Sequence, residues 1–181
     1  MLERDPAVQE LIDREAIRAC LYRYCRGIDR CDLETLKSVY WPDGVDNHVY
    51  FNGNAWEFAE WVVPLLKSRE QTMHMITNAM FTFVSGTEAK VESQYVGFER
   101  VQSPKRGVTD MFAGGRYLDR FEKRDREWRI LHRDVLWAWF RVNETTTDWS
   151  KGLFGKQVPF GKKCPEDPLY AVLGIAPGDR G

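Results

Sequence analysis

The sequence predicts an α+β fold: a cone-shaped barrel made by a strongly curved, mostly antiparallel sheet, with three N-terminal helices on its concave side. Two observations predict this class. Apolar residues recur at helical intervals in the first part of the chain, and long strand-like runs joined by short connections follow. The length of 181 residues suits one domain with a sizeable core. We expect residues 1–142 to form this domain and residues 143–181 to form a C-terminal arm.

Three helices are expected ahead of the long strands. The first has an apolar stripe over residues 8–24 and is predicted to fray at Gly27, because glycine lowers helix stability. The second is short and follows Asp32, whose side-chain oxygen can accept hydrogen bonds from the first turn. The third covers residues 56–66 with an apolar stripe of its own. All three stripes would face the sheet.

Strand-like patterns begin with a short run at residues 45–51, closed by a turn at Asn52 and Gly53. The later runs are long and consecutive, which favours an antiparallel meander. They cover residues 72–84, 89–101, 109–123 and 127–142. Glycine inside a strand is typical of a bulge or bend. The interior glycines of these runs are Gly97, Gly114 and Gly115.

The C-terminal arm contains many glycines and prolines, which keep regular structure short. It is nevertheless too apolar for a free tail. Its apolar residues include Trp149, Leu153, Phe154, Phe160, Leu169, Tyr170, Val172 and Leu173. We therefore expect the arm to wrap its own domain or a neighbouring subunit.

Charge and composition argue against several kinds of partner. Lys and Arg number 26 and Asp and Glu number 27, so the net charge is near zero. This balance gives no electrostatic reason to expect nucleic acid or an anionic membrane as a partner. The chain has no uncharged apolar run of about 18 residues, and its charged first residues lack an apolar signal region. We expect a cytoplasmic protein with reduced cysteines, whose spacing matches no zinc pattern.

Three histidines are present, and His74 is the one inside an otherwise apolar strand. On the concave face of a sheet it could accept a proton near neutral pH, or it could be a core histidine bound to one backbone carbonyl. Asp29 follows the stripe of the first helix. It could point inward and pair with a histidine, or outward towards Arg26 or Arg30. Tyr24, on the same side, could donate its hydroxyl to a substrate or pack in the core.

Two further places bring polar side chains near the predicted pocket. Asp46 and His48 share one strand face, so they could pair as a second Asp–His dyad or belong to a surface cluster before the turn. In the last strand, alternation separates Arg133 from His132 and Asp134. An inward Arg133 could bind a substrate carboxylate, phenolate or enolate. Alternatively, a carboxylate on a neighbouring strand satisfies it.

Other catalytic templates do not occur in the sequence. It has no glycine-rich phosphate loop and no dinucleotide fingerprint. No serine lies in a nucleophile elbow, and the histidines lack the spacing of a redox metal site. We therefore expect no metal and no cofactor, with the chemistry supplied by side chains and pocket electrostatics.

The order of the predicted elements, together with several short motifs, resembles the SnoaL-like branch of the nuclear-transport-factor-2-like superfamily. The resemblance runs from about Val8 to Val142. Its motifs are Leu11-Ile12-Asp13-Arg14-Glu15-Ala16-Ile17, Tyr22-Arg23-Tyr24, Gly27-Ile28-Asp29, Met73-His74 through Asn78, Gly115-Arg116-Tyr117 and Trp128-Arg129-Ile130.

Members of that branch include dehydratases and a dehydrochlorinase in which an Asp orients the His that removes a proton. The resemblance implies these roles for Asp29 and His74, and Tyr24 matches a tyrosine of one such dehydratase. An arginine on the last strand is matched more loosely, by Arg133 or alternatively by Arg141 or Arg116. The branch commonly forms dimers or trimers, so the resemblance also implies a homo-oligomer.

Residues and resemblance together predict a cofactor-independent lyase or isomerase, of the dehydratase or carbon–carbon lyase type, with an Asp–His dyad as general base. Seven Trp, seven Tyr and ten Phe favour an aromatic or polycyclic small-molecule substrate. The side chains expected to contact it are Tyr95, Phe112, Trp56, Trp137, Asn78 and His48. Two other functions fit the same sequence: a non-catalytic binding protein for a lipophilic metabolite, and a structural subunit of an aromatic-ring oxygenase.

Overall fold

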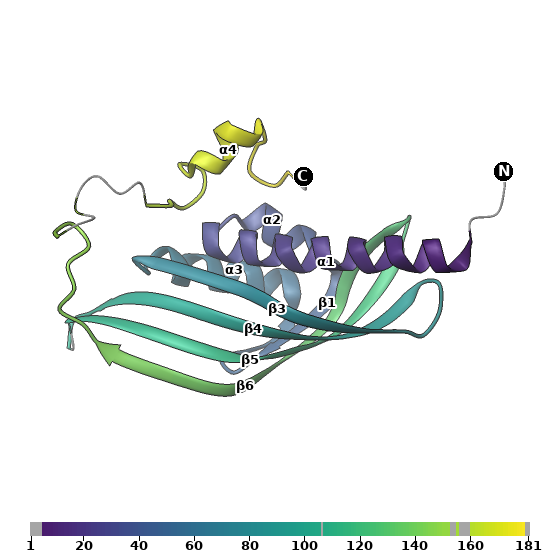
Figure 1. The fold of residues 1–181 in the computed structure, drawn as a ribbon, viewed down its shortest axis with the longest axis horizontal. Helices are drawn as coiled ribbons and strands as arrows, with labels where there is room; N and C mark the ends of the chain where they lie inside the picture. Colours follow the sequence, from purple (N-terminus) through teal and green to yellow (C-terminus); the bar gives the residue numbers. More distant parts are fainter. Residues whose placement is uncertain (1–4, 106, 153–154, 156–159, 180–181) are drawn as a thin grey trace.

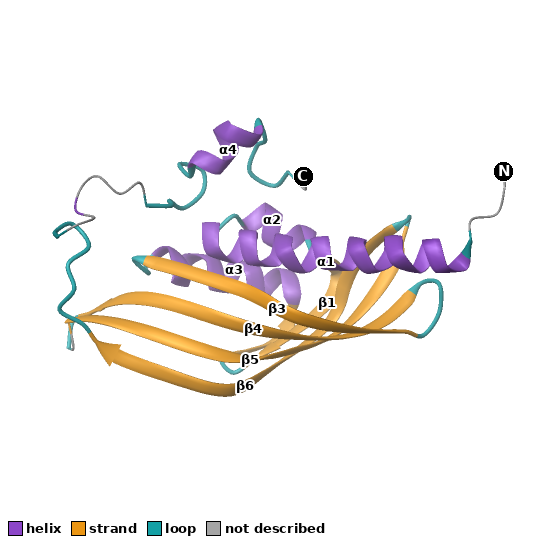
Figure 2. Cartoon of the chain, viewed as in Figure 1, coloured by secondary structure: helices purple, strands orange, loops and turns teal. Residues whose placement is uncertain are grey.

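The computed structural model describes residues 5–105, 107–152, 155 and 160–179. Three helices pack on one face of a six-stranded sheet, and the long strands curve beneath them (Figures 1 and 2). The helices are α1 (Pro6–Arg30), α2 (Leu33–Ser38), α3 (Ala55–Lys67) and, in the arm, α4 (Pro168–Leu173). The strands are β1 (Tyr40–His48), β2 (Phe51–Asn54), β3 (Gln71–Phe83), β4 (Glu88–Ser103), β5 (Gly107–Arg124) and β6 (Glu127–Glu144).

The sheet has the strand order β2-β1-β6-β5-β4-β3. Strands β3 to β6 form the antiparallel meander that their short connections predict. The exception to antiparallel pairing is β1, which lies parallel to β6 with Asp46 opposite Arg133. The α+β class, the curved sheet and the N-terminal helices are therefore as the sequence predicts.

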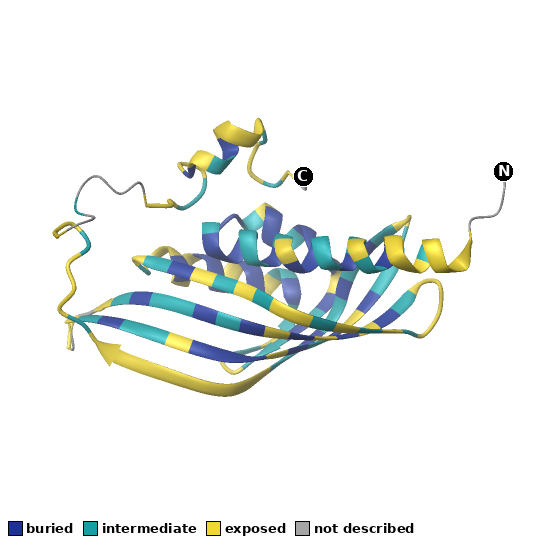
Figure 3. Cartoon of the chain, in the orientation of Figure 1, coloured by how far each residue is buried: buried dark blue, intermediate teal, exposed yellow. Residues whose placement is uncertain are grey.

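The core lies between the helix layer and the sheet. Its fully buried side chains come from both layers, with Leu21 on α1 and Phe58 on α3 packed towards Phe121 and Ile130 on the sheet. Burial of one such side chain contributes about 1.5–3 kcal/mol. In Figure 3 the buried residues concentrate where the helices face the strands. The two layers therefore stabilise each other.

Helix α1 does not fray at Gly27 but continues to Arg30, which corrects the prediction. The glycine serves a close approach: a Cβ atom there would lie 2.8 Å from the backbone nitrogen of Leu36 on α2. The helix ends at Cys31, whose backbone is left-handed with φ 53°. Asp29 consequently belongs to the last turn of α1. Asp32 caps α2 as predicted, accepting from the Thr35 backbone nitrogen at 3.1 Å.

The first strand also differs from the prediction. It begins at Tyr40 rather than Val45, and residues 49–50 form the turn, so Asn52 and Gly53 lie within β2. The pairing with β6 shifts register between Tyr40 and Val45, and this irregularity accommodates the proline and glycine of that stretch. The longer β1 places Tyr40, Asp46 and His48 on one strand.

The glycine pair in β5 lies at a bulge, as predicted. Register between β5 and β6 shifts between Gly114 and Gly115, and a Cβ at Gly115 would collide with the carbonyl oxygen of Leu136. Gly97 was expected at a similar irregularity, but it pairs in regular register with His74. The irregularity of that strand pair lies instead between Ile76 and Ala79 on β3.

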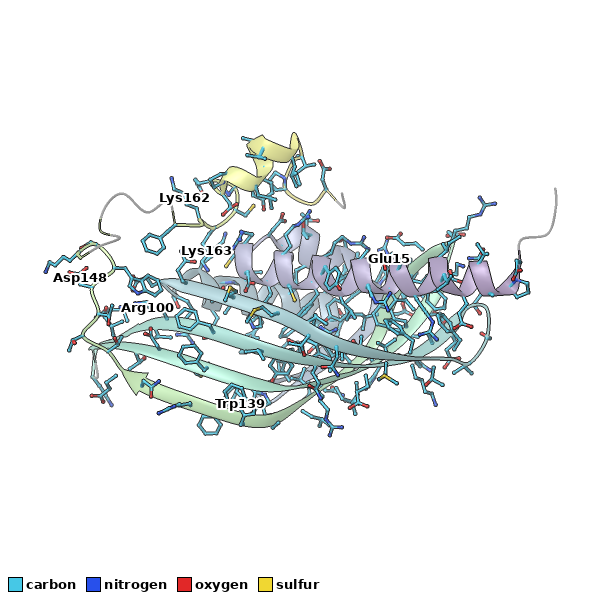
Figure 4. The ribbon with its side chains drawn as sticks, viewed as in Figure 1. Glu15, Arg100, Trp139, Asp148, Lys162 and Lys163 are labelled. Carbon is cyan, nitrogen blue, oxygen red and sulfur yellow. The ribbon has the colours of Figure 1, made fainter. Side chains whose placement is uncertain are left out.

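The arm returns from the end of β6 over the outer side of the helix layer (Figure 1). The backbone nitrogen of Cys164 donates to the carbonyl of Arg30 at 2.6 Å, and the hydroxyl of Tyr170 donates to Asp32 at 2.8 Å. Lys163, labelled in Figure 4, donates to the carbonyl of Asp29 at 3.3 Å. These contacts are to the arm's own chain, whereas Leu153 and Phe154 lie outside the described residues.

The division of the chain at residue 142 stays a prediction, and β6 itself runs to Glu144. None of the described helices is both long enough and apolar enough to cross a membrane.

Candidate active site

The last turn of α1 lies beside β3 and brings Asp29 to His74. One carboxylate oxygen accepts from the backbone nitrogen of His74 at 2.8 Å, and the other is 2.7 Å from its ring nitrogen Nδ1. Both side chains are largely buried. Because the carboxylate holds backbone and ring together, the imidazole has one orientation, with Nε2 as its unengaged nitrogen.

Space for that ring comes from the neighbouring strand. Gly97 lies opposite His74, and a Cβ at this position would be 3.5 Å from Cδ2 of the imidazole. A larger side chain at residue 97 would fill the space into which the ring projects. Alternation along β3 and β4 therefore gives His74 an inward position between Thr72, which is buried, and Ile76.

A second Asp–His pair lies on β1. Asp46 is fully buried and accepts hydrogen bonds from the hydroxyl of Tyr40 and from Nδ1 of His48. The His48 ring stacks on Phe58 of α3, with ring centroids 4.5 Å apart and planes inclined by 14°. The structure thus forms the second dyad that the sequence left open as an alternative.

Both histidines line one cavity of about 130 Å³ between α3 and the sheet. The residues with polar side chains in its lining include the two histidines, Glu99 and several tyrosines, among them Tyr24. Most of the lining is apolar, and it includes Phe58, Tyr95, Tyr117, Val135 and Trp137. An apolar cavity with a few convergent polar groups is the usual form of a small-molecule site.

Tyr24 lies on α1, and its ring meets that of Tyr117 edge to face at 5.6 Å. Burial raises the pKa of its phenol far above the ordinary value, so the hydroxyl stays protonated near neutral pH and can donate a hydrogen bond. Tyr95 stacks on the other side of Tyr117 at 4.5 Å, and burial raises its pKa to about 12. These phenols can stabilise developing negative charge as donors.

Arg133 lies behind this layer and does not line the cavity. It is fully buried and donates two hydrogen bonds of 2.7 Å to Asp119 on β5. This is the alternative predicted from the sequence, in which a carboxylate on a neighbouring strand satisfies Arg133. Its guanidinium lies over the rings of Tyr24 and Tyr117, at 4.3 and 4.0 Å. Arg133 therefore orients the tyrosines rather than contacting a ligand. Neither alternative, Arg116 or Arg141, lines the cavity either.

Three of the side chains expected to contact the substrate lie elsewhere, which corrects those assignments. Trp56 faces α2, with its indole nitrogen donating to the Lys37 carbonyl at 3.1 Å. Phe112 is on the opposite face of β5 from the cavity, against Phe98 at 5.1 Å. Asn78 is exposed, within the irregular stretch of β3. The cavity lining does include Tyr95, Trp137, His48, Tyr24 and His74. Asp29 does not line it but contacts Nδ1 of His74.

Sequence reasoning missed several lining residues, among them Phe58, Glu99, Met111 and Tyr117. Strand alternation could have found three of them. Glu99 lies two residues beyond Gly97 on β4, and Met111 and Tyr117 share the odd-numbered face of β5. The same alternation excludes Phe112. Among the described residues, no three His, Cys, Asp or Glu side chains gather in a way that could hold a metal ion.

A family model for the SnoaL-like domain matches residues 9–134. The chain belongs to the SnoaL-like family. The matched region includes both Asp–His pairs of this SnoaL-like domain and ends at Asp134, within β6. The arm lies beyond it. No curated protein matches the chain at a significant level.

Solved structures with the same fold include enzymes and a protein of unknown function. A hexachlorocyclohexane dehydrochlorinase of type 2 superposes with a TM-score of 0.68 at 18% identity, covering 76% of this chain and 93% of that one. A candidate scytalone dehydratase from Novosphingobium aromaticivorans gives 0.67 at 20% identity, covering 78% and 93%. A protein of unknown function from Mycobacterium tuberculosis gives 0.60 at 22% identity, covering 74% and 76%. At these identities the likeness shows a common fold.

Proposed function

We propose that this SnoaL-like protein is a cofactor-independent lyase of the dehydratase type, in which His74 removes a proton from a small aromatic substrate. One observation supports the proposal most: Nδ1 of His74 is 2.7 Å from Asp29, while the same ring lines an apolar cavity. A carboxylate bound at Nδ1 favours the tautomer whose Nε2 lone pair is free to accept a proton.

The other polar groups of the cavity suit the rest of the reaction. Removing a proton next to a carbonyl leaves negative charge on its oxygen, and a neutral phenol can stabilise this charge by donating a hydrogen bond. Tyr24 is such a phenol, because burial raises its pKa. Its ring lies against the Arg133 guanidinium, which holds it in place.

The size of the cavity indicates the size of the substrate. An engineered apolar cavity of about 150 Å³ in another protein holds one benzene molecule, so about 130 Å³ suits a single ring. Any further part of the molecule would extend past Trp61 and Trp137, which line the cavity but remain about two-fifths exposed. We therefore propose a substrate that places one aromatic ring in the closed part of the site.

The similar solved structures favour elimination over isomerisation. A dehydrochlorinase and a candidate scytalone dehydratase are both named for eliminations, of hydrogen chloride and of water. A base and a neutral hydrogen-bond donor around a mostly apolar cavity suit the same class of reaction here.

The test uses a panel of β-hydroxy ketones that carry one aromatic ring, with products followed by mass spectrometry. Wild-type protein should release water from at least one member, and His74→Gln should be slower by about a hundred- to ten-thousandfold. His132→Gln is the matched control, because His132 pairs with Asp134 at 3.1 Å but does not line the cavity. Equal rates for wild type and His74→Gln would contradict the proposal. Tight binding without turnover would favour the binding-protein alternative.

A further inference from the structure

Two Asp–His pairs lie at the cavity. The proposed reaction needs one general base and assigns that role to one pair, Asp29 and His74. His48 resembles His74 in its arrangement: a carboxylate engages Nδ1, the ring is about one-fifth exposed, and it lines the cavity. Stacking on Phe58 fixes its plane. Nε2 is therefore the nitrogen of His48 that remains to face a bound molecule.

One buried cation, Arg133, lies opposite Asp46 on β6, and it faces two buried carboxylates, Asp46 and Asp119. The side chains of Asp46, Asp119 and Arg133 have no exposed surface. Arg133 forms two parallel hydrogen bonds with Asp119, so these two charges offset each other. Asp46 receives a neutral phenol from Tyr40. A buried carboxylate is costly without a compensating charge, and protonated His48 would supply it.

Asp29 lies in a different environment. It accepts a backbone N–H from His74 at 2.8 Å, and the ammonium of Lys163 lies close by, donating to the carbonyl of the same residue at 3.3 Å. Its side chain also retains about a tenth of its surface in solvent. The Asp29 carboxylate therefore accepts a backbone N–H in addition to its contact with the His74 ring.

We propose that His48, held by Asp46, is the general acid that protonates the leaving oxygen in the reaction that His74 begins as base. This inference rests on the proposed function. His74 takes a proton from carbon, the electrons of that C–H bond form the double bond, and the C–O bond breaks. His48 gives its Nε2 proton to the departing oxygen, which leaves as water. A proton then passes from His74 to His48 through solvent, so the cycle consumes none.

The first test needs no substrate. Nitrogen-15 spectra of the imidazole rings, recorded near neutral pH, distinguish a ring protonated on both nitrogens from a neutral one. We expect His48 to be protonated on both nitrogens and His74 to be neutral. Asp46→Asn, checked for folding by circular dichroism, should convert His48 to the neutral form. A neutral His48 in the wild-type protein would overturn the proposal.

The second test compares two leaving groups on one skeleton: a β-hydroxy ketone with a single phenyl ring, and its acetate ester. Hydroxide requires protonation to leave, whereas acetate leaves as an anion. His48→Gln should slow the hydroxy ketone about a hundredfold or more and the acetate less than about fivefold. His74→Gln should slow both by about a hundredfold or more, because both begin with proton removal.

The outcomes separate the two proposals. If His48→Gln slows neither compound, or both equally, the acid role fails while the lyase with its His74 base stands. If wild type converts neither the hydroxy ketone nor the acetate, the proposed function fails for this class of substrate, and the acid role fails with it. His132→Gln should match wild type on both compounds.

Discussion

The two halves of β6 both contain tryptophan and arginine, but they have opposite surroundings. The first half contains Trp128, Ile130 and Arg133, all of them buried, whereas Trp139 is half exposed and Phe140 more so. Figure 3 shows this change along the strand, from a mixed pattern beside the helices to a continuous exposed stretch. Both halves alternate as strands do, and both contain tryptophan.

The difference shows that burial in this sheet depends on what lies over a strand more than on the residues of the strand. Helix α1 lies over the first half of β6, and Lys123 and Trp128 both bind Asp13 of that helix. Side chains of the second half are largely exposed, although Trp137 lines the cavity below α3. Substitutions of similar size should therefore have very different effects in the two halves.

The largest effect is expected for Arg133→Met. This change leaves the Asp119 carboxylate fully buried without its two hydrogen bonds, which costs about 3–5 kcal/mol in the free energy of unfolding. Urea denaturation followed by circular dichroism measures it. Adding Asp119→Leu to the same protein should restore most of the loss, because the carboxylate that Arg133 pairs with is then removed as well. A loss below about 1 kcal/mol for Arg133→Met alone would contradict the ion pair.

A smaller effect is expected for Trp128→Phe. The indole nitrogen donates to Asp13 at 2.8 Å, and a phenyl ring keeps most of the packing but not this bond. Loss of a hydrogen bond to a charged group costs about 1.5–3 kcal/mol. The same urea measurement applies, with Trp149→Phe, in the arm, as the matched substitution. If both variants lose equally little stability, the bond to Asp13 contributes nothing.

Acid should weaken the same contact. Burial raises the pKa of Asp13, but hydrogen bonds from Lys123 and Trp128 outweigh it, and the net pKa lies below the ordinary value. The folded state therefore gains stability from ionised Asp13 above the unfolded pKa of about 3.9, and loses it as pH falls through the lower folded pKa. Thermal unfolding between neutral and acidic pH should show a smaller acid-induced loss for Asp13→Asn than for wild type.

The smallest effect is expected for Phe140→Ser. The side chain is 68% exposed, so its removal should change the free energy of unfolding by no more than about 0.5 kcal/mol. Urea denaturation at low protein concentration checks this. A loss of several kcal/mol would show that the second half of β6 is covered in solution, for example by a second subunit of the predicted homo-oligomer.

Most of the fold could be predicted because the spacing of apolar residues along the chain distinguishes helices from strands. The four long strands begin and end within a few residues of the predicted runs. The errors come from tertiary contacts. Gly27 is typical of a helix end, yet it lies inside α1 because the backbone of Leu36 approaches it. Similarly, the first strand was predicted to start at residue 45, yet β1 begins at Tyr40 because β6 pairs with the chain on both sides of an irregular stretch that contains Pro42.

The candidate site was only partly accessible from the sequence. His74 and Asp29 are 45 residues apart along the chain and meet because the last turn of α1 lies beside β3. Spacing alone left that pairing open, and the family resemblance favoured it. Asp46 and His48 are two residues apart, so alternation put them on one strand face, but it left a surface cluster as the alternative to the pair that the structure forms. Arg133 shows the opposite case, since only the neighbouring strand reveals its partner Asp119.

The contact between Lys163 and the carbonyl of Asp29 has a practical consequence for handling the protein. Among the described residues, the last part of the arm contacts the ends of α1 and α2 through polar groups, including the Arg30–Asp167 ion pair, and partly exposed polar contacts open more easily than a core does. A fusion partner joined at the C-terminus would pull on the segment that touches Asp29, the partner of His74. Helix α1 begins at Pro6, at the opposite end of the helix from Asp29 (Figure 1), so purification tags belong before this helix.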